Sequence, residues 1–137
     1  MTNQFLEEAR KIRALTSPHY NCAQGVMIPF AEKKGYDTDK AFAIADGFGS
    51  GMRMGATCGA VTGSLMVLGM YGASDPQTIS EFYRRFRENH DGITNCRDLL
   101  RTCAQKNEVQ KNHCDGLVFE CVEILTELLR ERGLLES

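Results

Sequence analysis

The sequence has no tryptophan and only three prolines among its 137 residues. Its formal net charge is -2, and its lysines and arginines form no basic cluster, which removes the electrostatic basis for binding nucleic acid. No uninterrupted apolar run approaches the length that crosses a membrane. The first residues lack the basic and apolar regions of a secretory signal. We therefore expect a cytoplasmic protein with neither a nucleic-acid nor a membrane partner.

Strand-like patterns are missing as well. No segment alternates apolar and polar residues, whereas apolar residues recur at helical spacing along the whole chain. The length suits one domain with its own core. We predict an all-α fold in a single domain spanning residues 1–137, a compact bundle of about six or seven helices with a glycine-rich loop before the central helix. The spacing and the capping residues predict helices over residues 4–15, 22–34, 38–46, 57–71, 76–90, 96–103 and about 113–132.

The glycine-rich loop precedes the predicted helix 57–71. Alternating glycines at positions 47–51 favour left-handed turns or a close approach of the backbone to a ligand. A helix, and not a strand, precedes this loop, which excludes the nucleotide-binding fingerprints that alternating glycines otherwise suggest. Candidate positions for binding a cofactor here are Gly49, Gly51, Arg53 and Gly59.

Arg53 and the glycine pair that follows it each allow two interpretations. Arg53 is the single charge within the loop, and it either holds an anionic ligand or keeps the loop soluble. Gly59 and Gly63 lie one helical turn apart, and this small-residue face admits either a neighbouring helix or a ligand.

Six cysteines in a reducing compartment indicate chemistry more than a disulfide framework. Four of them fall in the first turn of a predicted helix, where free N–H groups and the helix dipole favour the thiolate. These four, called the cysteine quartet below, are Cys22, Cys58, Cys96 and Cys114. Cys103 and Cys121 follow seven residues later, about 10 Å along a helix axis, and we interpret them as buried apolar residues in a deeper layer.

Simple up-and-down connectivity makes the second, fourth and sixth helices parallel, so their first turns meet at one end of the bundle. The polar stretch 104–112 spans about 30 Å when extended, which lets the last helix begin at the same end. The sequence therefore predicts that the whole quartet converges.

Four converging thiolates suit three kinds of site. An iron–sulfur cluster held by four cysteines fits the ligand count and benefits from nearby N–H groups. Zinc also fits the count, although no C-x-x-C pair is present. A thiol–disulfide couple needs no cofactor and only two of the cysteines; Cys58 is then the best candidate for the low-pKa nucleophile, with Cys22 as a second catalytic candidate.

The histidines receive mixed interpretations. His113 precedes Cys114, and His19 lies three residues before Cys22, so each is a candidate ligand or proton carrier as well as a solvated residue. His90 follows the fifth predicted helix and is interpreted as an exposed cation at its C-terminus.

The segment Cys58-Gly59-Ala60-Val61-Thr62-Gly63, together with the other three quartet cysteines, resembles the C_GCAxxG_C_C family of redox proteins from about Tyr20 to Leu129. More distantly the chain resembles the non-haem part of split-Soret cytochromes, although it has no C-x-x-C-H haem attachment motif. The resemblance implies a small helical domain with the quartet as the family's cysteine set and a redox role. The more distant resemblance to split-Soret cytochromes implies an iron–sulfur cluster as the occupant.

Three functions therefore compete. The first is electron transfer or redox sensing through a metal-binding cluster, the second is a thiol oxidoreductase, and the third is a zinc-stabilised or metal-free helical binding module. A redox role requires a partner protein, which the sequence does not name, and a homodimer is compatible with the chain.

Overall fold

The computed structural model describes residues 3–135 and confirms the all-α prediction. Within these residues it contains seven α-helices, two short helical turns and no β-strand. The helices are α1 (Gln4–Arg13), α2 (Cys22–Lys34), α3 (Thr38–Ile44), α4 (Gly59–Met70), α5 (Pro76–Glu88), α6 (Cys96–Gln105) and α7 (Gln110–Glu131). The glycine-rich loop joins α3 to α4, as predicted, and contains the turns η1 (Asp46–Phe48) and η2 (Gly51–Gly55).

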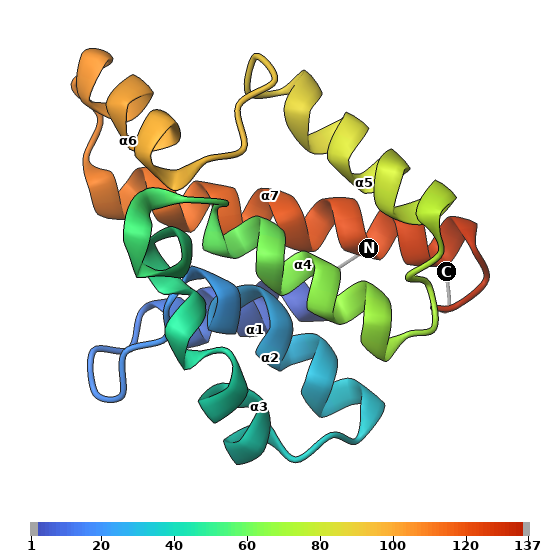
Figure 1. The fold of residues 1–137 in the computed structure, drawn as a ribbon. Helices are drawn as coiled ribbons and strands as arrows, with labels where there is room; N and C mark the ends of the chain where they lie inside the picture. Colours follow the sequence, from blue (N-terminus) through green and yellow to red (C-terminus); the bar gives the residue numbers. More distant parts are fainter. Residues whose placement is uncertain (1–2, 136–137) are drawn as a thin grey trace.

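Helices α2, α4 and α7 form the centre of the molecule (Figure 1). Helix α1 packs against α2 and α7, α5 lies along the C-terminal half of α7, and α6 lies over its N-terminal half. The largest fully buried side chains come from these elements and include Phe30, Phe82, Phe86, Leu125 and Leu128. Burial of these apolar faces is the main source of stability for such a bundle.

Glycine in α4 allows α2 and α4 to pack closely. A Cβ atom on Gly63 would lie 2.6 Å from the carbonyl oxygen of Ala23, a distance that real side chains do not tolerate. Gly59, one turn earlier, faces the N-terminal end of α2 in the same way, with the backbone N of Ala23 3.2 Å from its built Cβ. Of the two interpretations of this small-residue face, helix packing is the one observed at Gly63. It brings the beginnings of α2 and α4 together.

The boundaries near the C-terminal helix differ from the prediction. Helix α6 continues to Gln105 and α7 already begins at Gln110, so the link is residues 106–109 and the predicted nine-residue link is wrong. The polar residues after Gln110 extend the helix because they find partners along it. Lys111, for example, binds Asp115 one turn later at 3.1 Å and the carbonyl oxygen of Arg13 at 3.2 Å.

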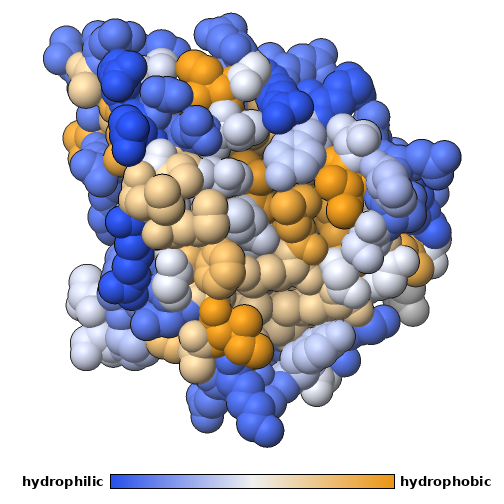
Figure 2. Space-filling model, viewed as in Figure 1, coloured by the Kyte–Doolittle hydropathy of each residue, from blue (hydrophilic) through white to orange (hydrophobic). Residues whose placement is uncertain are grey.

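One face of the molecule carries an apolar region. Figure 2 shows apolar side chains gathered over α4 in the middle of the face that it draws. Met66 and Met70 of α4 line a groove there together with Ile44 and Tyr36. Among the described helices, none combines the length and the apolar character that crossing a membrane requires.

Candidate functional site

All four members of the cysteine quartet line one cavity, so the structure brings together the residues that their helix positions singled out. The cavity measures about 50 Å³, which is more space than one water molecule requires. Its other walls are polar at Ser50 and Gln110 and apolar at Gly59, Leu99, Leu100 and Leu117. Cys58 is only 3% exposed, whereas the other three cysteines are half-buried, so the cavity lies just below the surface.

Cys22 is fixed by the cap of α2. The side chain of Asn21 accepts a hydrogen bond from the N–H of Gln24, and the Gln24 side chain accepts one from the N–H of Asn21, each at 2.8 Å. The amide of Asn21 also donates to the carbonyl oxygens of Ala45 and Asp46 at 3.2 Å. The beginning of α2 is thereby tied to the glycine-rich loop.

Cys58 and Cys96 are held side by side by a pair of backbone hydrogen bonds. The N–H of Cys58 donates to the carbonyl oxygen of Thr94 at 2.8 Å, and the N–H of Cys96 donates to that of Ala56 at 2.6 Å. This short antiparallel bridge joins the segments before α4 and α6. Cys58 is the N-cap of α4 and not a first-turn residue, one position earlier than predicted, while Cys96 begins α6 as predicted.

Cys114 reaches the cavity from the fifth position of α7, because α7 begins earlier than predicted. The neighbouring Asp115 forms an ion pair of 2.8 Å with Arg13, whose side chain is 5% exposed. Arg13 also donates to the carbonyl oxygen of Tyr20 at 2.7 Å and so joins α1, the segment before α2 and α7 next to the site. Sequence reasoning missed Arg13, because a single arginine in an amphipathic helix carries no signal that its side chain is buried.

The thiols differ strongly in acidity. The thiol of Cys114 donates a hydrogen bond to the sulfur of Cys22, which together with the charge of Arg13 lowers the pKa of Cys22 from 9.0 to about 7. The same hydrogen bond and burial raise the pKa of Cys114. Burial raises the pKa of Cys96 and raises that of Cys58 to about 12.

The predicted low pKa of Cys58 is therefore wrong. The N–H groups of Ala60 and Val61 in the first turn of α4 do lower its pKa, as the helix position suggested, but the loss of hydration outweighs them. In the metal-free protein Cys22 is the most acidic thiol of the quartet.

The glycine-rich loop adopts a strained backbone beside the cavity. Ser50, Gly51, Met52 and Arg53 are consecutive residues with φ between 51° and 62°, the left-handed region that costs side-chain-bearing residues about 1–2 kcal/mol each. Ser50 lines the cysteine cavity, and Gly51 lies against Cys96. Gly47 and Gly49, in contrast, do not have positive φ.

The candidate cofactor-binding positions separate into two groups. Gly59 lines the cysteine cavity and Gly51 supports it, whereas Gly49 and Arg53 line a different cavity together with His19. Arg53 is exposed, donates to the carbonyl oxygen of Asp46 at 3.0 Å and lies 3.5 Å from its carboxylate. Its observed partner is thus the loop itself.

The remaining cysteines and histidines lie away from the quartet's cavity. Cys121 is fully buried in the core, in agreement with its interpretation as a buried apolar residue. Cys103 is also buried, but near His113. The interpretation of His90 as an exposed cation is wrong, because its side chain is 16% exposed, contacts Glu120 at 2.9 Å and packs on Phe86.

Fold and site together define an all-α protein with four cysteines around one cavity. The model of the family described as "Putative redox-active protein (C_GCAxxG_C_C)" matches residues 20–128. The chain therefore belongs to this family of cysteine-containing redox-active proteins, which confirms the resemblance seen in the sequence. No match was found among curated proteins or among solved structures. The more distant likeness to split-Soret cytochromes stays a prediction.

Proposed function

We propose that this protein is an electron-transfer or redox-sensing protein whose cysteine quartet ligates one iron–sulfur cluster. The observation that carries the proposal is the cavity that Cys22, Cys58, Cys96 and Cys114 line together, although they come from four different helices. An iron–sulfur cluster held by four cysteine thiolates requires this donor set. When bound, such a cluster supplies one-electron transfer.

The residues around the cavity fit a negatively charged group. Arg13 places a buried positive charge close enough to lower the pKa of Cys22, and the N–H groups at the start of α4 favour the thiolate of Cys58. Leu99, Leu100 and Leu117 make one side of the cavity apolar and so reduce the hydration of the sulfurs on that side. Charge, N–H donation and solvent exclusion are the protein's means of setting a cluster's potential.

The exposure of the site fits exchange of electrons with another protein. Three of the four cysteines are half-buried, so a partner's redox centre can approach the site closely. The partner belongs to the proposal and is defined only as a redox protein.

A second candidate function rests on the shared cavity of Cys22 and Cys114 and on the lowered pKa of Cys22. The Cys22 thiolate would attack the disulfide of a partner protein, release one partner thiolate and form a mixed disulfide. Cys114, after losing its proton to solvent, would then attack the Cys22 sulfur, which leaves a Cys22–Cys114 disulfide and a fully reduced partner. Two electrons pass from the two thiols to the partner disulfide. In this reaction Cys22 replaces Cys58 as the nucleophile because its pKa is about 7.

The two functions differ in what anaerobically purified and reconstituted protein contains. The cluster proposal predicts iron, acid-labile sulfide and a visible charge-transfer band that dithionite bleaches, all lost in Cys58→Ser. Protein that stays colourless and free of sulfide, yet forms a Cys22–Cys114 disulfide reversibly, overturns the cluster and supports the dithiol. Zinc without sulfide, lost in the same variant, overturns both and supports a structural zinc site.

A further inference from the structure

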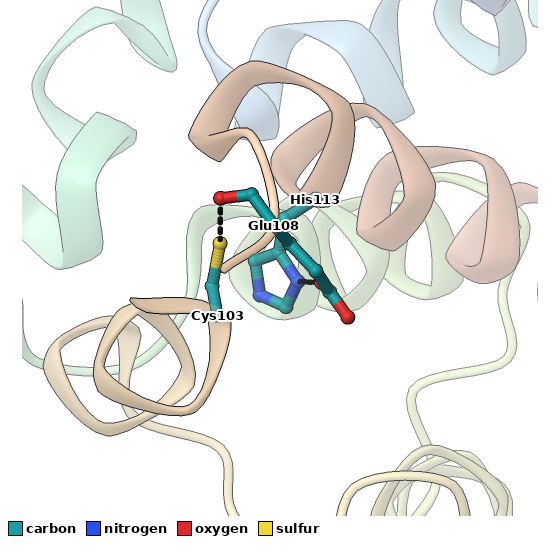
Figure 3. A group of neighbouring side chains, drawn as sticks. All are labelled: Cys103, Glu108 and His113. Atoms are coloured by element: carbon teal, nitrogen blue, oxygen red, sulfur yellow. Dashed lines mark hydrogen bonds and ion pairs between the residues drawn. The ribbon is translucent and has the colours of Figure 1, made fainter. Parts of the chain in front are cut away.

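A second group of metal-binding side chains lies at the junction of α6 and α7. Cys103 is near the end of α6, Glu108 is in the link, and His113 is in the first turn of α7. One ligand atom from each of the three lies within 4.8 Å of the others. Figure 3 shows the imidazole of His113 between the Cys103 thiol and the Glu108 carboxylate. Successive members of the group are five residues apart in the sequence. This spacing does not by itself predict a metal site, so only the fold reveals the group.

These three side chains still have atoms that could bind a metal ion. The Nδ1 of His113 lies 3.3 Å from a carboxylate oxygen of Glu108, and the Cys103 thiol donates to the Glu108 carbonyl oxygen at 3.4 Å. The Nε2 of His113, within the described part of the chain, is a buried side-chain nitrogen without a hydrogen-bond partner. A buried polar atom without a partner costs roughly 1–3 kcal/mol. The unpaired nitrogen belongs to a ring that is grouped with a thiol and a carboxylate, so a bound metal ion would relieve this cost.

The charge of the group matches a divalent ion. A thiolate, a carboxylate and a neutral imidazole carry two negative charges and offer one sulfur, one oxygen and one nitrogen donor. This mixed set suits zinc and neighbouring transition metals better than magnesium or calcium, which prefer oxygen ligands.

The group also borders open space. Glu108 and His113 line a cavity of about 370 Å³ whose other walls include Asn112, His90 and Glu120. Three protein ligands with access to such a cavity leave a coordination position for water or a small ligand. From these observations we infer that Cys103, Glu108 and His113 bind one zinc-type divalent ion with an open position toward this cavity.

The second site adjoins the quartet without sharing a ligand with it. Leu99 and Leu117 line both cavities and form the wall between them. His113 directly precedes Cys114, so an ion that holds His113 also fixes the part of α7 that presents Cys114. The inference stands whether or not the quartet holds a cluster.

Cobalt(II) is the probe for this site, because tetrahedral cobalt absorbs in the visible and a thiolate ligand adds a near-ultraviolet charge-transfer band. The titration uses the full chain with Cys22→Ser and Cys96→Ser, which removes half of the quartet. We expect one cobalt ion per chain with both kinds of band. In this background Cys103→Ser should abolish the charge-transfer band, and Glu108→Gln should weaken binding at least about tenfold, since even partners behind the ligands typically matter that much.

Glu108 is exposed, so its substitution does not threaten the fold. The matched control is His90→Gln, which alters the same cavity outside the three ligands and should leave the cobalt affinity unchanged. Absence of cobalt binding overturns the inference. Cobalt binding that Cys103→Ser and Glu108→Gln leave unchanged also overturns it. So does a loss of cobalt affinity in His90→Gln that is as large as the loss in Glu108→Gln. If circular dichroism shows that the double-serine background is unfolded, the unmodified chain is titrated, and Glu108→Gln should weaken the binding of one cobalt equivalent at least about tenfold.

Discussion

Gly51 lies directly against Cys96. A Cβ atom on Gly51 would be 2.7 Å from the Cβ of Cys96 and 2.5 Å from the carbonyl oxygen of Ala56, which accepts the hydrogen bond from the N–H of Cys96. Gly51 also has φ of 62°, where side-chain-bearing residues are strained. The glycine-rich loop thus acts on the quartet as a support that sets the position of one cysteine.

The substitution Gly51→Ala should therefore damage the site more than the fold. The added methyl group displaces Cys96 or Ala56, so we expect the iron and sulfide bound after anaerobic reconstitution to fall to less than about half. Gly47→Ala is the control in the same loop, because a Cβ there meets nothing within 4 Å and φ is not positive. Equal cluster contents in the two variants would refute the supporting role of Gly51.

The metal-free protein should show an unusually reactive Cys22. Since its pKa is lowered from 9.0 to about 7, the thiolate persists down to neutral pH, and the rate of alkylation by iodoacetamide should rise with a midpoint near pH 7. The substitution Cys114→Ala removes the hydrogen-bond donor and should move the midpoint upward. Mass spectrometry of the Cys22 peptide measures the rate. A midpoint near 9 that Cys114→Ala leaves unchanged would contradict the assigned interaction.

Two glycines of α4 should respond to alanine in opposite directions. At Gly63 the new Cβ would collide with the backbone of Ala23, and overpacking of this kind typically costs about 1–3 kcal/mol of unfolding free energy. At Gly69 nothing lies within 4 Å, so alanine should stabilise the helix by about 0.5–1 kcal/mol. Urea denaturation of both variants tests the close packing of α2 on α4. A neutral Gly63→Ala would mean that the two helices can separate at little cost.

The buried ion pair beside the site should matter more than an exposed one. Arg13→Met keeps most of the apolar stem but removes the buried partner of Asp115, which then keeps only Lys111 at 3.1 Å. We expect a loss of about 2 kcal/mol, below the value for a fully buried pair because Asp115 is 20% exposed and retains this second cation. Arg84→Met on α5 breaks two exposed pairs and should cost less than about 1 kcal/mol. Thermal or urea unfolding compares the two variants. Similar small losses in both would show that Arg13 does not stabilise the α1–α7 contact.

The sequence predicted the helices because helical spacing of apolar residues determines the elements. Helices α2 and α4 begin at the same end, as alternation of helices predicts, but the predicted parallel course of α6 is wrong, because α6 runs in the opposite sense (Figure 1). Cys96 joins the quartet because the segment before α6 pairs with the segment before α4. Cys22 and Cys96 begin their helices, and Cys58 differs by one residue. The start of α7 was less predictable, because Gln110 and its neighbours are polar and stay helical through side-chain contacts that only the fold provides.

The missed features depend on burial and on contacts between distant residues. The first-turn position of Cys58 favours the thiolate locally, but its depth in the core decides the pKa. Arg13 and His90 look like surface charges in sequence and are both mostly buried beside carboxylates. The group formed by Cys103, Glu108 and His113 exists because the link between α6 and α7 turns back on itself.

The most direct test of the account is the iron and acid-labile sulfide content of six single variants, one for each cysteine, after the same anaerobic reconstitution. The account predicts that four of the six variants lose iron and sulfide and that two retain them. Serine at Cys22, Cys58, Cys96 or Cys114 should lower the content strongly, whereas alanine at Cys103 or Cys121 should leave it at the level of the unmodified protein. Protein without iron and sulfide in every sample, or losses that do not follow the quartet, would contradict the central claim that these four cysteines hold one redox cofactor.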